Sequence, residues 1–162
     1  MNMKPTKHLL KNKLFFALLL FFPILGYAMT FLNPLKACTF SEMNIQITLD
    51  GEPAKGAEVI RLVKWKKEKI DNFTADEEGR VELPAMFESS TTNLLPMEFV
   101  ATQLITVKYK GKEYEIWNYA KRKPEKNFEL EGKPFSLKCE LSKEDELHEV
   151  FSSLLVTQCT WE

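Results

Sequence analysis

Side chains that could act as nucleophiles, acid–base catalysts or metal ligands are scarce in this chain of 162 residues. The two histidines are His8 and His148, and the three cysteines, Cys38, Cys139 and Cys159, are separated by 101 and 20 residues. Neither spacing matches a tight metal-binding motif. Nucleophilic catalysis needs a base beside the nucleophile, and His148 stands alone in a charged stretch. We therefore predict no catalytic, cofactor-binding or metal-ligating residue, and we expect a protein that is not an enzyme.

Carboxylates offer the remaining route to chemistry. The 23 Asp and Glu residues leave open a hydrolase that uses two carboxylates, as glycosidases do, although we expect none to stand in an apolar setting that would raise its pKa. The acidic run 76–78 precedes Gly79 but lacks the alternating oxygen ligands of a calcium loop. Glycine is the preferred last residue of a four-residue turn. We therefore interpret Asp76-Glu77-Glu78-Gly79 as a turn and not as a metal site.

An odd number of cysteines in an exported chain indicates one disulfide and one cysteine with another role. Cys139 and Cys159 lie in segments with strand character, and antiparallel pairing about residue 149 sets them opposite each other. The same register sets Leu137 opposite Trp161. We favour this disulfide, and a Cys38–Cys159 pair that ties the first strand to the last is the alternative. Cys38 is also a candidate lipidation site, because Leu35-Lys36-Ala37-Cys38 resembles a bacterial lipobox with lysine at one small-residue position.

The N-terminus has the pattern of an export signal. Four lysines precede an apolar run over residues 14–25, and Gly26-Tyr27-Ala28 provides small residues before a cleavage point after Ala28. An uncleaved anchor is the second interpretation, since residues 14–32 are about enough to span a bilayer of ~30 Å. A lipoprotein signal that ends at Cys38 is the third. All three place the body outside the cytoplasm, because lysines before an apolar segment hold that end inside.

The body consists of short apolar runs separated by turns. Residues 43–49 alternate between apolar and polar side chains, which indicates a half-buried strand, and Asp50-Gly51 followed by Pro53 ends it. Similar runs predict the strands 59–65, 70–75, 80–83, 98–109, 112–117, 135–141 and 150–161. We expect loops at 64–69, 85–96 and 118–133. About seven or eight strands without a long amphipathic helix predict a single all-β domain with the architecture of a β-sandwich.

The domain organisation that follows has three parts. We assign residues 1–28 to a signal peptide or membrane anchor, residues 29–41 to a linker and residues 42–162 to the β-sandwich domain.

Two motifs carry a resemblance to known proteins. Gly51-Glu-Pro53-Ala-Lys-Gly56-Ala57 and Thr74-Ala-Asp76-Glu-Glu-Gly79 resemble the carboxypeptidase regulatory-like, transthyretin-like superfamily. That resemblance implies an immunoglobulin-like antiparallel sandwich. The body from Cys38 to Trp161 also resembles an uncharacterised family of exported proteins, a domain of unknown function from Gram-negative bacteria. This second resemblance implies a binding or structural module and supplies no functional residues.

Charge and aromatic residues direct the functional expectation. After the four N-terminal lysines, 18 basic and 23 acidic residues leave a charge of about −5, which argues against nucleic acid as a partner. We expect a non-catalytic module of the periplasm or cell envelope that binds a protein or another envelope component. The candidate partner surface consists of Trp65, Trp117, Tyr119 and Arg122, because aromatic and arginine side chains are typical binding anchors. An immunity or inhibitor protein directed against a secreted toxin is the alternative, and an envelope hydrolase ranks below both.

Overall fold

The computed structural model describes residues 36–90, 98–130, 132, 135–150 and 153–161. The predicted signal or anchor, 1–28, and the first part of the predicted linker lie outside these residues. Within them, no helix is long and apolar enough to cross a membrane. The described residues form strands and a single 3₁₀ turn, η2 (Phe128–Leu130), so this part of the chain is all-β, as predicted.

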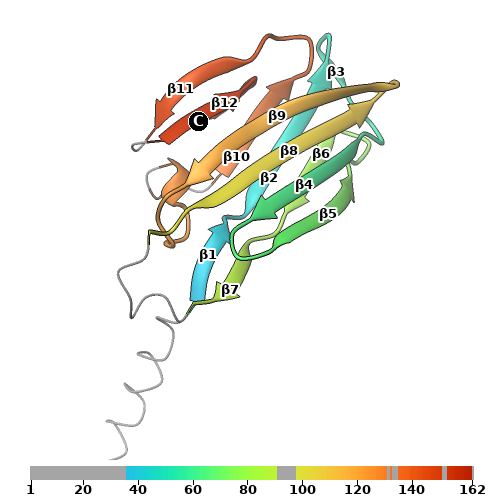
Figure 1. Ribbon diagram of the computed structural model, residues 1–162. Coiled ribbons are helices and arrows are strands. Elements are labelled where there is room, and N and C mark those ends of the chain that lie inside the picture. The colour runs from blue at the N-terminus through green and yellow to red at the C-terminus, as the bar shows by residue number, and fades with distance from the viewer. Residues whose placement is uncertain (1–35, 91–97, 131, 133–134, 151–152, 162) are drawn as a thin grey trace, which may run out of the picture. The chain divides into compact units, whose positions relative to one another are not determined.

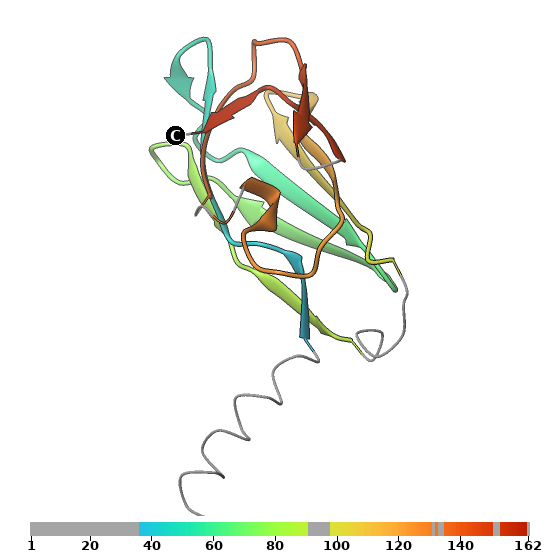
Figure 2. The same ribbon diagram turned by 90° about the vertical axis from the view of Figure 1, so that its left-hand side faces the viewer.

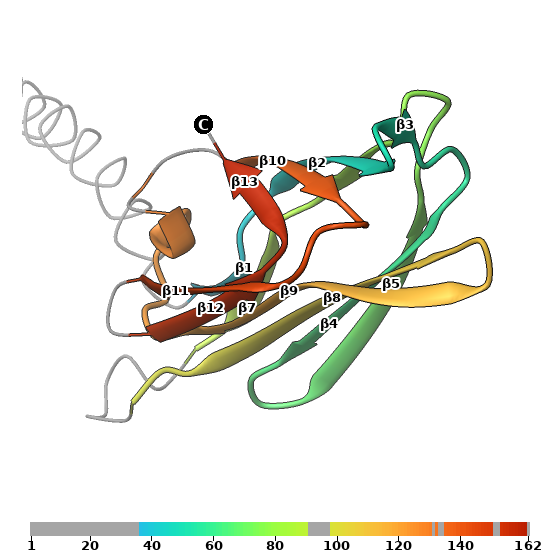
Figure 3. The same ribbon diagram turned by 90° about the horizontal axis from the view of Figure 1, so that it is seen from above.

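Two large sheets face each other across one core (Figure 1). The strands of the six-stranded sheet, in spatial order, are β11 (Glu146–Val150), β12 (Ser153–Thr157), β9 (Lys112–Lys121), β8 (Ala101–Tyr109), β4 (Glu58–Lys64) and β5 (Glu68–Thr74). The second sheet contains β13 (Cys159–Trp161), β10 (Phe135–Glu140), β2 (Met43–Leu49) and β3 (Glu52–Pro53), with β6 (Arg80–Leu83) also paired to β2. All pairs are antiparallel except β2 with β10. The view from above shows the two layers (Figure 3).

The core forms where the inward residues of the two sheets meet. Alternation in β2 buries Met43, Ile45 and Ile47, and alternation in β4 buries Val59 and Val63. These side chains belong to one cluster with residues of β8, β9 and β12. Leu130 of η2 joins the cluster, and Figure 2 shows this short helix beside the two layers. The period-two pattern in the sequence therefore identifies the strands that build the core.

A bulge in β9 changes which side chains face inward. Ile105 pairs with Trp117 while Thr106 pairs with Glu115, which leaves Ile116 as an extra residue. A bulge shifts the alternation by one residue. Ile116 and Trp117 are both buried as a result, and Tyr119 follows Trp117 into the core.

Three segments expected outside strands are in fact strands. Lys36–Phe40, expected within the linker, forms β1 and pairs with β7 (Met86–Ser89), which was expected within a loop. β9 extends to Lys121, into the segment predicted as a loop from residue 118. The loop predictions fail because a short segment becomes a strand when another strand lies beside it to pair with. The polarity of the segment's own residues does not show that such a partner exists.

The turn before β6 has the structural role that the sequence predicted. Gly79 N–H donates to the carbonyl of Asp76, and Asp76 Oδ1 accepts hydrogen bonds from the N–H groups of Glu78 and Arg80. Gly79 has a φ of 72°, and a Cβ atom there would lie 2.4 Å from the carbonyl oxygen of Ile47. Glycine is required at this position by both the backbone conformation and the close approach of β2.

Glu140 holds the β2–β3 turn against β10. Its carboxylate accepts hydrogen bonds from the N–H groups of Asp50 and Gly51 and from the hydroxyls of Thr48 and Ser142. Partial burial alone would raise the pKa of Glu140, but the hydrogen bonds from Ser142, Thr48 and Gly51 lower it to about 2.

This shift predicts an acid-dependent loss of stability. Because the pKa is lower in the folded chain than its usual 4.5, the stabilisation is complete above about pH 4.5 and is lost as the pH falls through 2. The melting temperature of the wild type should therefore decline over this window more steeply than that of Glu140→Gln. Thermal unfolding followed by circular dichroism between pH 7 and pH 2 measures both curves. Parallel curves for the two proteins would show that Glu140 does not carry this dependence.

Candidate partner-binding surface

The four residues predicted to form a partner surface do not lie together. Trp117 and Tyr119 are fully buried, and their rings contact each other at 5.9 Å within the core. That part of the prediction is wrong because the β9 bulge turns both side chains inward. Trp65 is half-buried and contacts Phe99, with a ring separation of 5.2 Å. Arg122 is exposed and pairs with Glu98.

A different set of side chains forms an exposed apolar surface. The strand registers of the six-stranded sheet align six residues, one from each strand, on the outer face of the sheet. We call these six residues the outer row. In order the outer row is Leu147, Val156, Asn118, Leu104, Leu62 and Ile70. Five of these six residues are aliphatic. Leu147 is 65% exposed and Ile70 is 56% exposed, at opposite ends of the row.

The sequence contains a partial signal for this row. Val59–Val63 has apolar side chains on both faces of its strand, and Leu154–Val156 is continuously apolar. Such runs are typical of strands covered on both faces. The alignment itself depends on five strand registers, which could not be predicted from the sequence.

The interior contains a cluster of polar and charged side chains that the sequence did not reveal. Lys121 Nζ lies 2.9 Å from Glu129 Oε2, and both side chains are completely buried. The hydroxyl of Ser41 donates to Glu129 Oε2 at 2.7 Å and accepts from Lys121 at 3.1 Å. Gln103 donates to Glu129 Oε1 at 2.8 Å and accepts from the Trp117 indole. We call Ser41, Gln103, Trp117, Lys121 and Glu129 the buried polar cluster.

The buried polar cluster joins segments that are far apart in sequence. It ties the β1–β2 connection to β8, β9 and η2. A serine beside a lysine can form a nucleophile–base pair. Here the Ser41 hydroxyl donates to a carboxylate, and Ser41, Lys121 and Glu129 have no exposed surface. This arrangement fits a structural role, in which the buried polar cluster holds these segments together.

Tyr119 borders this cluster. Its hydroxyl is buried and has no hydrogen-bond partner among the described residues. Burial, and then the nearby Glu129 carboxylate, raise the pKa of Tyr119 to about 12.

The structure contains a disulfide between Cys139 and Cys159, the pair that the sequence analysis favoured. The pairing of β10 with β13 sets Cys139 opposite Cys159 and Leu137 opposite Trp161, which is the predicted register. Such a bond is typical of an oxidising, extracytoplasmic location. Cys38 is a buried free thiol within β1, and its sulfur lies 3.2 Å from the carbonyl oxygen of Phe40. In this structure the Cys38 thiol is therefore not the partner of Cys159.

His148 has more partners than its charged surroundings indicated. It lies in β11, where its ring contacts Trp161 edge-on at 5.2 Å and its Nε2 lies 3.5 Å from Glu146. These side chains line a hollow of about 220 Å³ together with Lys143 and Thr160. No serine, threonine or free cysteine is held against the imidazole by a hydrogen bond in the described structure.

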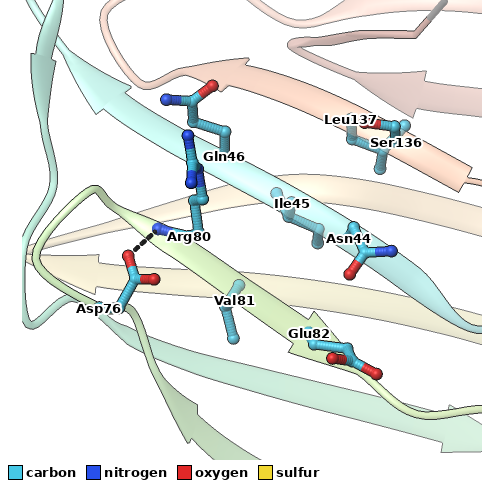
Figure 4. A pocket seen from close by; sticks show the side chains of 9 residues that line it. All are labelled: Asn44, Ile45, Gln46, Asp76, Arg80, Val81, Glu82, Ser136 and Leu137. Atoms are coloured by element: carbon cyan, nitrogen blue, oxygen red, sulfur yellow. Dashed lines mark hydrogen bonds between the residues drawn. The ribbon is translucent and has the colours of Figure 1, made fainter.

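The outer face of the second sheet is polar. A hollow of about 440 Å³ extends over β2, β6 and the start of β10, and Figure 4 shows its lining side chains. Asn44, Gln46, Arg80 and Glu82 project from paired positions on β2 and β6. Asp76 lies at the edge of this hollow, where its Oδ1 accepts a hydrogen bond from the Arg80 N–H at 2.7 Å. This face differs sharply in chemistry from the outer row.

Comparisons with known proteins give a family assignment. No group of three or more metal-ligating side chains occurs among the residues placed by the structure. No curated protein and no solved structure matches the chain. A family model described as a domain of unknown function, DUF6795, matches residues 43–144, which extend from β2 to the turn after β10. Because this match covers more than half of the sequence, the chain belongs to the DUF6795 family.

Proposed function

We propose that the protein is a non-catalytic, exported module of the cell envelope that binds another protein through its outer row. The observation that carries this proposal is the row of aliphatic side chains on five of the six strands of one sheet, which Asn118 interrupts on β9 and which is most exposed at its two ends. Exposed apolar surface of this kind commonly marks an interaction site.

The contrast between the two outer faces supports the choice of surface. The second sheet presents amide, guanidinium and carboxylate side chains from β2 and β6. The six-stranded sheet presents Leu147, Leu154 and Ile70, each more than half exposed. Burying one aliphatic side chain of this size contributes about 1.5–3 kcal/mol.

The chemistry around the outer row defines the partner. The neighbouring positions on the same face include Lys64, Thr102 and Glu149, which are exposed and polar. An apolar centre with a polar rim is the usual anatomy of a protein–protein interface. The expected partner is therefore a folded protein with a flat aliphatic patch.

We also propose the finer fold type and the cellular location of the protein. Two facing sheets, the corner at Gly51–Ala57 and the turn at Asp76–Gly79 support an immunoglobulin-like sandwich of the transthyretin and carboxypeptidase-regulatory type. The Cys139–Cys159 disulfide and the basic-then-apolar N-terminus support export to the periplasm, in free or anchored form.

Binding measurements with matched variants test the proposal. The protein is recovered from the envelope with its stoichiometric partner, and the purified partner is titrated against variants. Ile70→Thr combined with Leu147→Thr should weaken the Kd by about 30- to 100-fold, because both ends of the row lose aliphatic surface. Phe87→Thr removes an equally exposed apolar side chain from β7, outside the row, and should change the Kd by less than about two-fold.

Other results would redirect or overturn the proposal. Equal losses in the row variant and in Phe87→Thr would show that the row is not the interface. A partner that is a secreted toxin, inactivated by this protein, would support an immunity role. Turnover of an ester, glycoside or peptide by the purified protein would contradict the non-catalytic assignment.

A further inference from the structure

The charge of the body is divided between its two ends. One end, which we call the basic end, comprises residues 36, 64–69, 87–90, 98–100 and 122–123. It contains seven basic residues and three glutamates, with Glu149 beside Arg122 at its edge, in a body that is acidic as a whole. The basic residues are Lys36, Lys64, Lys66, Lys67, Lys69, Arg122 and Lys123.

Contacts show that these segments lie together. Lys66 Nζ donates to the carbonyl oxygen of Ser89 at 2.8 Å, and Ser89 is the register partner of Lys36. Lys69 pairs with Glu88 at 3.3 Å. Figure 1 shows the β4–β5 connection at the same end of the body as the start of β1 and the end of β7. The tip of the β4–β5 hairpin and the first described residue of the chain therefore share one end of the body.

Aromatic side chains accompany the lysines at this end. Lys66 Nζ lies 4.4 Å from the centre of the Trp65 ring, and Trp65 contacts Phe99. Phe87 is 50% exposed on the adjacent strand. Lysines beside half-buried aromatic rings are typical of surfaces that lie in the headgroup region of a bilayer.

The opposite end has the opposite charge. The segments 50–58, 76–80, 108–115 and 140–146 contain twelve acidic and six basic residues. They are joined by hydrogen bonds of Glu140 to Asp50 and Gly51 and by the ion pair of Lys55 with Glu77. An anionic surface would therefore attract one end and repel the other.

The sequence before Lys36 limits how far the basic end can lie from a membrane. Ten residues, 26–35, separate the apolar run 14–25 from Lys36, and ten residues span at most about 35 Å. When this run is retained in a bilayer, the basic end is the part of the body that the chain holds nearest to the lipid.

We infer that the basic end is a contact surface for anionic phospholipid headgroups. The exposed lysines bind the headgroup phosphates, and Trp65 and Phe87 contact the headgroup–acyl boundary. The acidic end faces away from the bilayer, and the outer row lies on the side of the body. The basic end contains none of the six residues of the outer row, although Lys64 borders both surfaces, and the inference does not depend on the proposed protein partner.

Short-range fluorescence quenching in nanodiscs tests this inference with the full chain. A fluorophore is attached at Lys67→Cys or at Lys110→Cys, while the native Cys38 stays buried. The discs contain phosphatidylcholine alone or mixed with phosphatidylglycerol, and the quencher is a spin-labelled headgroup. We expect at least about three-fold stronger quenching at residue 67 than at residue 110, in the anionic discs only. The difference should disappear at about 1 M salt, where the Debye length is ~3 Å.

Matched charge variants complete the test. In the chain labelled at residue 67, Lys64→Gln with Lys66→Gln should reduce the contact equilibrium by about 30-fold. Lys110→Gln with Lys112→Gln removes the same charge from the acidic end and should leave the quenching unchanged. Equal quenching in the two lipid compositions would overturn the inference, because the tether is the same in both. Equal quenching at residues 67 and 110 would overturn it as well.

Discussion

Replacing Lys121 with methionine is expected to lower the free energy of unfolding by about 3–5 kcal/mol, because it leaves the buried Glu129 carboxylate without its counter-charge. Both side chains are completely buried and lie 2.9 Å apart. For a domain of this size, the loss corresponds to a fall in melting temperature on the order of 10–20 °C. Chemical denaturation gives the free energy, and calorimetry gives the melting temperature.

A double-mutant cycle separates the ion pair from the rest of the buried polar cluster. Glu129→Met also removes the acceptor for Ser41 and Gln103, so it should be at least as costly as Lys121→Met. The double variant should cost at least about 2 kcal/mol less than the sum of the two, since neither charge is left alone. The exposed Lys112→Met should change stability by less than about 0.5 kcal/mol. Additive single variants would contradict a coupled ion pair.

Removal of the disulfide is the second change with a large expected effect. Cys139→Ala should lower the free energy of unfolding by about 3 kcal/mol, because the bond closes a loop of 20 residues in the unfolded chain. The partner variant Cys159→Ala should cost a similar amount. Denaturant unfolding of both variants provides the measurement.

The third cysteine supplies the control for this prediction. Cys38→Ala removes a buried thiol without removing a cross-link, so it should cost about 1 kcal/mol or less. Peptide mapping without reductant should recover residues 139 and 159 in one linked pair. Recovery of Cys38 in a disulfide, or a wild-type melting temperature for Cys139→Ala, would contradict the pairing.

The elements with regular alternation could be predicted from the sequence. Residues 43–49 and 135–140 alternate between apolar and polar side chains without interruption, so the sequence predicts which side chains face the core. The β10–β13 register also follows from that alternation. The turn that ends at Gly79 was also predictable, because its requirements are local. The alternation of side chains in a strand and the residue preferences of a turn depend only on neighbouring residues. They therefore hold wherever no bulge interrupts the strand.

The partner surface depends on information that is not local. The extra residue Ile116 reverses which face of the sheet each later side chain of β9 points to. The residue types in 112–121 do not indicate that a bulge occurs there. Lys121 and Glu129 lie in a stretch whose polar composition is typical of a solvated loop. In the structure they pair with each other in the core, and Ser41 and Gln103, from two other segments, hydrogen-bond to them. The outer row exists only when six strands are set in their registers. These features require the tertiary structure.

Site-specific photo-crosslinking in intact cells tests the central proposal most directly. A photoreactive residue is placed at Asn118, the exposed centre of the outer row, and separately at Ser136, which is exposed on the polar face of the second sheet. We expect Asn118 to yield one dominant crosslinked envelope protein and Ser136 to yield none of it. The crosslink from Asn118 should be lost when Ile70→Thr and Leu147→Thr are added. The same crosslinked protein from both positions, or no crosslinked protein from Asn118, would contradict a partner interface on the outer row.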